Sequence, residues 1–526
     1  MKKYLTLTLL TFTLLLSACS SDSNDDTAQS PEAESNEPGR TINYSLATDI
    51  QKLDPHTENV VVNWKVGFNV YDRLVTQNES MDLEPGLATE WQTIDPTTWE
   101  FKLRDDVTFH DGTEFNADAV KANLDRSLAE ETISPTAYLY DRIEEVEVVD
   151  PYTVRFHLSE PFASLPAHLA QYGGSMLSPE VIKEDNEAVA NGADPGSIVA
   201  EKPIGTGPFK FESWSPGSEI KLVRNEDYWG GAPDIEGVTY KIVPEELTRV
   251  ADLETQASDI IDSINPNSME QIENSDAASI IETDSTYVNF LGFNTNKKPF
   301  DDIRVRQAIS MAIDKDVIVD SILNGIGTVA NSPLSPNDFG FADVDALPFD
   351  PDAAKELLEE AGQSNLTLEL SVNDDRTRVD IATYIQQALQ DIGVTVEISQ
   401  MEFASFVEYT GQGEADLFLL GRSSPTGDGY NALFTILHSN KQSSNQLRYT
   451  YANPEFDQLV DQSIQTEDEA ERNALFQEAQ DIVANDVPFD FLYYPVDLLG
   501  VSDQITGVKT LPSGVVLLKD VKVVDQ

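Results

Sequence analysis

The chain has 526 residues, 40% of them hydrophobic, and its 34 Lys and Arg against 92 Asp and Glu give a formal net charge of −58. This charge repels nucleic acid and anionic membrane surfaces, so we expect neither as a binding partner. The acids are spread along the chain and form no single tail. This distribution indicates that they keep the protein soluble in a saline or alkaline medium. The length is typical of about three domains.

The N-terminus has the pattern of a secretory signal. Two lysines precede an apolar run over residues 5–16, and a pair of small residues precedes Cys19, the only cysteine of the chain. The run is too short to span a membrane, which takes about 20 apolar residues. Its setting resembles the lipobox of bacterial lipoproteins, which implies removal of residues 1–18 as a signal peptide and acylation of Cys19, palmitate included. The alternative is an ordinary cleavage site that lies beside this cysteine by chance.

Residues 19–40 indicate a tether. Ser, Asp, Asn, Glu and Pro dominate here, and no apolar residue larger than alanine occurs. Such a segment has nothing to bury, so we predict a flexible, disordered link. The folded body would then hang from the outer face of a membrane by the lipid alone.

The first half of the body is predicted to be rich in antiparallel strands. Trp99, Phe101 and Leu103 alternate with polar residues and share one face of a strand over 98–104. Asn116 is a suitable N-cap for a helix over 117–128. Hairpins are expected over residues 144–158 and 209–223, each around a proline-containing turn.

The second half predicts a different architecture. Apolar strands over 366–370, 394–398 and 417–420 alternate with helices over 379–389 and 403–409, which indicates a parallel α/β unit. Another helix is expected to begin at Asp301 and to close near Gly325. The sequence therefore predicts an α/β protein with two lobes of different character.

Two groups of polar residues follow strands of the predicted parallel sheet, where ligands bind in such folds. Arg376 and Arg378 come after the strand that ends near Val372, and Asp428 comes after the strand over 417–420. A carboxylate and a guanidinium at one edge would suit a zwitterion, because the first pairs with an ammonium and the second with a carboxylate. For Asp428, which lies between two glycines, turn formation is the competing interpretation.

Motifs for catalysis, metal or cofactor binding are absent from the sequence. The five histidines are scattered, and neither His-Glu-x-x-His, Gly-x-Ser-x-Gly nor a phosphate-binding Gly-x-x-x-x-Gly-Lys occurs. Gly205 and Gly207 precede a proline and a strand, which argues against a nucleotide loop. We therefore predict no enzyme, no metal and no cofactor, although a secreted hydrolase and a surface adhesin or signalling receptor stay as alternatives.

Several motifs resemble one family over nearly the whole chain from Arg40 onward, the dipeptide-, oligopeptide- and nickel-binding proteins of bacterial ABC importers. The most distinctive segment consists of LATEW at 87–91, WEFKLR at 99–104, VTFHDG at 107–112 and FNADAV at 115–120. In family order there follow GTGPF at 205–209, RN at 224–225 with YW at 228–229, RVRQAI at 304–309 with Asp314, and AA at 353–354 with LL at 357–358 and AG at 361–362.

The resemblance implies a two-lobed, three-domain fold of the class II periplasmic-binding-protein type, with a hinge between the lobes. Domain I would consist of residues 41–80, 201–288 and 500–526, domain II of 81–200, and domain III, the second lobe, of 289–499. Two strands near 287–294 and 489–500 would cross between the lobes. The implied function is that of a monomeric, extracytoplasmic receptor lipoprotein that captures a di- or oligopeptide and delivers it to a membrane permease with ATPase subunits.

The resemblance also implies roles for single residues. Asp428 matches the aspartate that pairs with the ligand amino terminus, in a loop that includes Gly427, and either Arg376 or Arg378 would hold the carboxylate. The sequence departs from the family at Arg422, where relatives often carry Trp, and at Tyr430, where many carry a second acid. Both departures lie in the specificity loop. A receptor for nickel, a metal chelate or another small solute stays as the alternative, although the scattered histidines supply no ligand set.

Overall fold

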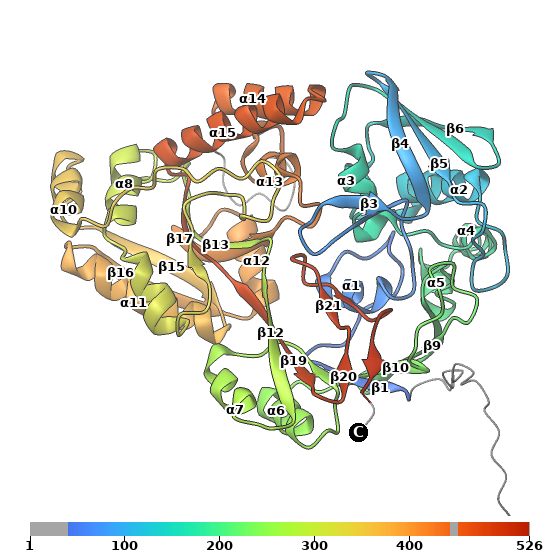
Figure 1. Cartoon of the computed structure of the whole chain (residues 1–526). Helices are drawn as coiled ribbons and strands as arrows, with labels where there is room; N and C mark the ends of the chain where they lie inside the picture. Colours follow the sequence, from blue (N-terminus) through green and yellow to red (C-terminus); the bar gives the residue numbers. More distant parts are fainter. Residues whose placement is uncertain (1–39, 442–450, 525–526) are drawn as a thin grey trace, which may run out of the picture. The chain divides into compact units, whose positions relative to one another are not determined.

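The computed structural model describes residues 40–441 and 451–524, which form an α/β structure with several separate sheets (Figure 1). The mixed α/β class predicted from the sequence is confirmed. The predicted signal segment, Cys19 and most of the tether lie outside the described residues. Within those residues, every helix is too short or too polar to pass through a lipid bilayer.

A seven-stranded sheet is assembled from distant parts of the chain in the order β12-β19-β11-β1-β10-β9-β8. β1 is parallel to both of its neighbours, β10 and β11, and the pairs β10-β9, β9-β8, β11-β19 and β19-β12 are antiparallel. Fully buried side chains such as Ile42, Tyr44 and Tyr240 form its core. The strands are β1 (Ile42–Leu46), β8 (Phe209–Ser215), β9 (Glu219–Arg224), β10 (Gly237–Ile242), β11 (Ile260–Ile261), β12 (Ala278–Asp284) and β19 (Val496–Ser502).

A six-stranded sheet has the order β14-β18-β13-β17-β15-β16, with β15 parallel to both β16 and β17. This parallel unit confirms the α/β prediction for the second half. The strands are β13 (Tyr287–Phe293), β14 (Thr328–Val329), β15 (Thr367–Asn373), β16 (Thr395–Met401), β17 (Leu417–Ser423) and β18 (Phe489–Tyr494).

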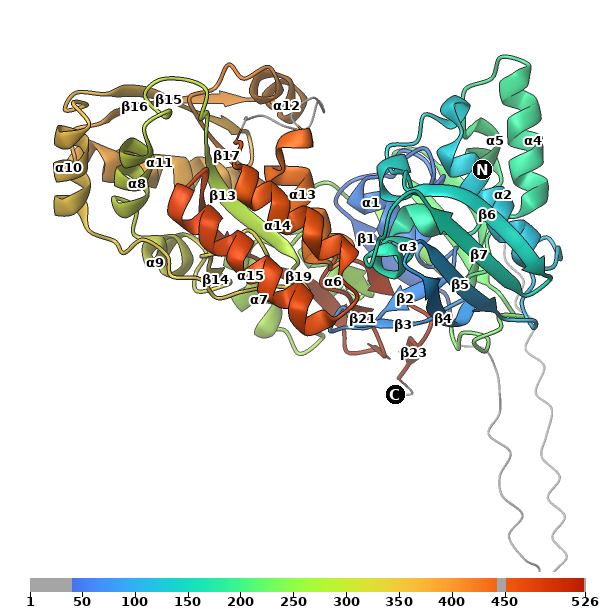
Figure 2. The ribbon, with the colours of Figure 1, turned by 90° about the horizontal axis from the view of Figure 1, so that it is seen from above.

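Helices pack against this sheet through two different hydrophobic clusters. One cluster joins the sheet to α8 (Ile303–Met311), α10 (Pro351–Glu360) and α11 (Arg376–Asp391). The other joins it to α13 (Gly429–Leu437), α14 (Pro454–Gln465) and α15 (Glu469–Asp486). In Figure 2, α14 and α15 lie side by side in front of the sheet.

A four-stranded antiparallel sheet carries the motifs of the first half, in the order β4-β5-β7-β6. Its strands are β4 (Ala88–Asp95), β5 (Thr98–Leu103), β6 (Ile143–Asp150) and β7 (Thr153–Leu158), and α2 (Ala117–Leu128) packs on it. The predicted cap is confirmed, because the Asn116 side chain accepts a hydrogen bond from the Ala119 N–H at 3.1 Å. Both predicted hairpins, β6-β7 and β8-β9, are also present.

The remaining elements are short or peripheral. The helices are α1 (Val61–Gly67), α3 (Leu165–Leu169), α4 (Pro179–Ala190), α5 (Ser197–Glu201), α6 (Glu246–Glu254), α7 (Met269–Glu273), α9 (Lys315–Val317) and α12 (Phe403–Gly411), with a π-helical turn over Ile318–Ile322. Short 3₁₀ turns cover Glu130–Thr132, Ala137–Leu139, Tyr172–Gly174, Pro266–Ser268 and Ser439–Lys441. Three two-stranded sheets pair β2 (Val75–Gln77) with β3 (Leu83–Pro85), β20 (Ile505–Thr506) with β23 (Lys522–Val523), and β21 (Lys509–Thr510) with β22 (Val516–Leu517).

One helix boundary differs from the sequence prediction. The cap of α8 is Asp302, whose carboxylate accepts from the Arg304 N–H at 3.0 Å, and not Asp301. The helix also ends at Met311, and a separate short helix and the π-helical turn complete the stretch toward Gly325. Two adjacent aspartates have equal capping chemistry, so the choice depends on which backbone geometry the packed helix adopts.

The chain passes between the seven- and six-stranded sheets at two places. Only Ser285 and Thr286 separate β12 from β13, and only Pro495 separates β18 from β19. The crossing at Pro495 falls within the second predicted connecting stretch, near 489–500, whereas the crossing at Ser285 and Thr286 immediately precedes the first, near 287–294. The division into three domains with the bounds given above stays a prediction.

Candidate ligand-binding site

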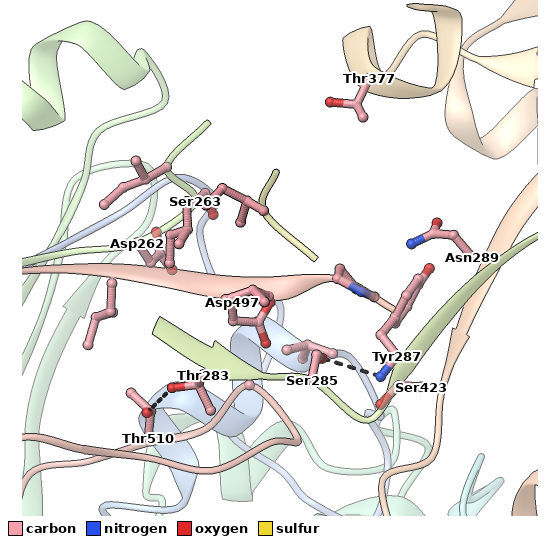
Figure 3. Close-up of a pocket in the computed structure, with 18 of the residues that line it drawn as sticks. Asp262, Ser263, Thr283, Ser285, Tyr287, Asn289, Thr377, Ser423, Asp497 and Thr510 are labelled. Atoms are coloured by element: carbon pink, nitrogen blue, oxygen red, sulfur yellow. Dashed lines mark hydrogen bonds between the residues drawn. The ribbon is translucent and has the colours of Figure 1, made fainter. Parts of the chain in front are cut away.

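A cavity of about 650 Å³ lies at these two crossings, and we call it the crossing cavity (Figure 3). Its wall combines the first residues of β13 and β19 with the N-terminal turn of α11, the β21-β22 hairpin and α1. Residues from both large sheets therefore face one space. The volume lies within the range of about 300–1,000 Å³ that is usual for small-molecule sites.

Arg378 lines the crossing cavity from the first turn of α11. Its guanidinium donates to the Asn373 side-chain oxygen at 2.9 Å and to the Tyr287 hydroxyl at 3.3 Å. The Tyr287 ring occupies the space beside Gly421, where a Cβ would clash with it. Within residues 40–441 and 451–524, no carboxylate lies within ion-pair distance of this guanidinium. Arg378 is thus a positioned cation whose charge is available to an anionic group.

Asp497, on β19, also lines the crossing cavity, in the part where Asp262, Ser263 and Ser285 lie (Figure 3). Its side chain is exposed to solvent. Desolvation by the surrounding protein nevertheless raises the pKa of this carboxyl, as does Asp262, whereas Lys65 and a hydrogen bond from Ser285 lower it. Lys65 itself forms an ion pair with Asp262. The cavity therefore offers a carboxylate as well as a guanidinium.

The predicted specificity loop lies elsewhere, at the N-terminus of α13. Asp428 is only 4% exposed and caps α13 by accepting from the Tyr430 N–H at 2.9 Å. Its carboxylate also accepts from Arg472 at 2.9 and 3.2 Å and from the Ser164 hydroxyl at 3.1 Å. Asp428 does not line the crossing cavity.

The other predicted residues are also placed by specific contacts. Gly427 has φ +62° and packs on Met81 and Gln77. The Tyr430 hydroxyl accepts from Arg142 at 2.6 Å, and Arg422 donates to the Thr435 hydroxyl at 2.6 Å. Arg376 is 84% exposed, pairs with Asp380 at 2.9 Å and borders a separate pocket beside the crossing cavity.

The structure thus brings Asp428, Gly427 and Tyr430 together and places Arg378 alone of the six predicted residues in the lining of the crossing cavity. Sequence reasoning missed Tyr287 and Asp497. A signal for Asp497 exists, because it is a single acid in the otherwise apolar run Val496-Asp497-Leu498-Leu499. Arg472, the partner of Asp428, has no such signal, since it lies in a helix rich in charged residues.

A second buried carboxylate lies behind the loop, at Asp338. One of its oxygens accepts from the Ser335 N–H at 2.8 Å, and the adjacent Phe339 N–H donates to the Gly427 carbonyl at 2.8 Å. Burial raises the pKa of Asp338 to about 7, and the nearby Asp428 contributes in the same direction.

The raised pKa of Asp338 predicts a pH-dependent contribution to stability. The folded state holds this proton more tightly than the unfolded chain, whose ordinary value is 3.8, so the contribution is present at low pH and is lost as pH rises toward 7. Asp338→Asn cannot ionise and does not lose this contribution. The wild type should therefore lose about 4 kcal/mol of unfolding free energy relative to the variant between pH 4 and 8, because its pKa rises from 3.8 to about 7 on folding and each pKa unit is worth about 1.4 kcal/mol. Denaturant titrations at both pH values would measure this loss, and parallel pH profiles of the two proteins would contradict it.

Within the described ranges, no three or more His, Cys, Asp or Glu side chains are gathered as a metal would require. The geometry instead defines a cavity of small-molecule size that is lined from two sheets. The profile described as "Bacterial extracellular solute-binding proteins, family 5 Middle" matches residues 82–444. The chain belongs to this family, and the match confirms the resemblance found in the sequence. The members of this family are substrate-binding proteins rather than enzymes.

Similar proteins cover almost the whole chain. Heme-binding protein A of Haemophilus influenzae is 31% identical over 546 residues, which is 98% of each chain. Glutathione-binding protein GsiB of Pectobacterium atrosepticum is 30% identical over 487 residues, covering 90% of this chain and 93% of that one.

Solved structures show the same fold. A dipeptide-binding protein from a Pseudoalteromonas species, in complex with Met-Leu, has a TM-score of 0.82 at 25% identity and covers 92% of this chain and 100% of its own. The periplasmic binding protein DppA of Helicobacter pylori, in complex with the peptide STSA, has a TM-score of 0.79 at 28% identity over 93% and 99% of the two chains. The periplasmic-binding-protein fold expected from the resemblance is therefore confirmed.

Proposed function

We propose that this protein is the extracytoplasmic receptor of an ABC-type importer and that it captures a peptide in the crossing cavity. The observation that carries the proposal is Arg378, a guanidinium in the lining of a cavity between two sheets, with no carboxylate within ion-pair distance in the described residues. Relatives named for glutathione and solved structures with bound peptides support a peptide as the solute.

The role of Arg378 follows from its chemistry. A guanidinium presents parallel N–H donors that match the two oxygens of a carboxylate. One terminal nitrogen of Arg378 donates to Asn373 and the other to Tyr287, which fixes the guanidinium and reduces the side-chain entropy lost when a ligand binds. We therefore assign the peptide carboxylate to Arg378 and not to Arg376, which is exposed and already paired. Most of the remaining affinity would come from main-chain hydrogen bonds, so capture would tolerate different side chains.

The cellular setting is part of the proposal. Acylation at Cys19 and a tether over residues 19–40 would hold a monomeric receptor at the outer face of the cell membrane, beside a permease that works with cytoplasmic ATPases. The supporting observation is the lysine, apolar and small-residue pattern that ends at Cys19. Mass spectrometry of the mature N-terminus, with Cys19→Ser as the control, would test the anchor.

The binding function is tested by calorimetry and by product analysis on the same samples. Purified protein is titrated with di-, tri- and tetrapeptides and with glutathione, and the solution is then examined for cleaved peptide. We expect binding at one peptide per protein without turnover. Hydrolysis would favour the secreted hydrolase, and binding of nickel or a metal chelate with no peptide bound would favour the alternative receptor. Loss of peptide uptake in a deletion strain would separate import from adhesion or signalling.

A further inference from the structure

Asp497 and Arg378 line the same cavity but belong to different sheets. Asp497 is the second residue of β19 in the seven-stranded sheet, whereas Arg378 belongs to α11, which packs on the six-stranded sheet. The chain crosses between the sheets immediately before β19. A solute held by both residues would therefore connect the two sheets directly.

We propose that Asp497, and not the loop residue Asp428, accepts the ammonium group of the solute. The inference rests on the proposed peptide capture and names the second charged contact of that site. It assigns the amino end of a zwitterion to the β19 side of the crossing cavity and the carboxylate end to the α11 side.

Asp497 is suited to the task because it is exposed and, within the described residues, forms no ion pair of its own. Its side chain is exposed within the cavity lining and accepts a hydrogen bond from the Ser285 hydroxyl. In the part of the chain that the structure describes, no Lys or Arg lies within ion-pair distance of it. An ammonium with several N–H donors would supply the missing positive charge.

The other acids of the crossing cavity are already engaged. Asp262 forms an ion pair with Lys65 and accepts from the Ala47 N–H at 3.1 Å. Asp375 caps α11 by accepting from the Arg378 N–H at 2.9 Å. Counting Lys65 and Arg378 against Asp262, Asp375 and Asp497, the ionised lining carries one more negative than positive charge, and Asp497 is the acid without a partner of its own.

Asp428 is poorly suited in this structure. Two contacts to Arg472 and one each to Ser164 and Tyr430 occupy its oxygens, and it lies outside the cavity lining. An ammonium would have to displace Arg472, which would leave a guanidinium buried without its carboxylate. Asp497 requires no such exchange.

A ligand that pairs with Asp497 and Arg378 would also favour the closed arrangement of the sheets. Either contact alone is possible when the sheets are apart, but both together require them to be near each other. A ligand shifts a conformational equilibrium only by its difference in affinity for the two states. The two terminal charges of a short peptide would supply this difference.

The experiment compares the binding of Met-Leu and N-acetyl-Met-Leu to the full mature chain by calorimetry. If another peptide of the panel binds with higher affinity than Met-Leu, that peptide and its N-acetylated form are used instead. For the wild type, acetylation should weaken binding by at least 30-fold. For Asp497→Asn, the free peptide should bind at least 30-fold more weakly, whereas the acetylated peptide should bind within threefold of its wild-type affinity. The acetylation penalty should thus disappear only in this variant, because the variant lacks the carboxylate that the ammonium needs.

Asp428→Asn is the matched control, since it removes the other candidate carboxylate at equal size. It should keep the full acetylation penalty. If the penalty persists in Asp497→Asn, or disappears in Asp428→Asn, the assignment of the amino end is overturned while peptide capture stands. If the wild type binds no peptide of the panel, the proposed function and this inference both fail. Equal melting temperatures of wild type and Asp497→Asn would show that the variant is folded. Asp497→Glu keeps the negative charge, so part of the affinity loss caused by N-acetylation of the peptide should return in this variant.

Discussion

Arg378→Ala is expected to weaken the binding of a peptide with a free carboxylate by about 2–5 kcal/mol, the usual cost of removing one partner from a desolvated charge pair. The structural reason is that Arg378 lines the crossing cavity and has Asn373 and Tyr287, but no acid, as hydrogen-bond partners. Calorimetric titration of wild type and variant with the same peptide would measure the change.

The neighbouring arginine provides the control. Arg376→Ala removes the same charge two residues away, from a side chain that is 84% exposed and pairs with Asp380. Its effect on affinity should stay below about 0.5 kcal/mol. A C-terminally amidated peptide should bind Arg378→Ala and wild type almost equally. If Arg378→Ala binds the free-acid peptide as tightly as the wild type does, the carboxylate is held elsewhere.

Arg472→Ala is expected to lower the free energy of unfolding by about 3–5 kcal/mol, because it leaves the Asp428 carboxylate buried without its counter-ion. The two side chains are 7% and 6% exposed, and Arg472 also donates to the Ser164 hydroxyl at 2.9 Å and to the Ser463 carbonyl at 3.1 Å. The Arg472 guanidinium lies 4.9 Å from the Phe339 ring centre, which adds a cation–π contact. Urea denaturation followed by tryptophan fluorescence would measure the loss.

Two further variants sharpen this test. Arg376→Ala removes an exposed arginine and should change the free energy of unfolding by less than about 1 kcal/mol. In Arg472→Ala/Asp428→Asn the buried charge is gone, so part of the lost stability should return. A loss below about 1 kcal/mol for Arg472→Ala would mean that water reaches Asp428 and that the ion pair is not buried in solution.

Local elements of the fold could be predicted because their signals lie within a few neighbouring residues. The helix over Ala117–Leu128 has both the predicted bounds and the predicted cap, since capping and periodicity depend only on adjacent positions. The motifs VTFHDG and GTGPF were likewise recognisable. Their contact was not, because the bonds that join them, from the His110 N–H to the Gly205 carbonyl at 2.8 Å and between the His110 ring and the Gly207 carbonyl at 3.0 Å, connect distant segments.

The sequence does not decide which of the two predicted arginines, Arg376 or Arg378, reaches the ligand site. It predicts a helix over 379–389, which leaves both arginines in the preceding segment. The structure begins α11 at Arg376. Residues two positions apart on a helix do not face the same direction, which is why Arg378 lines the crossing cavity and Arg376 borders the neighbouring pocket.

The amino-acid sequence by itself determined the charge and the short-range elements, because each depends on composition or on the spacing of nearby residues, and its motifs indicated the family. Only the tertiary structure decided which charges neutralise one another. Asp428 and Arg472 are 44 positions apart and pair inside the protein, whereas Asp497 and Arg378 line one cavity with no ion-pair partner in the described residues. Coulomb interactions depend on distance and burial in space, and the order of residues along the chain fixes neither.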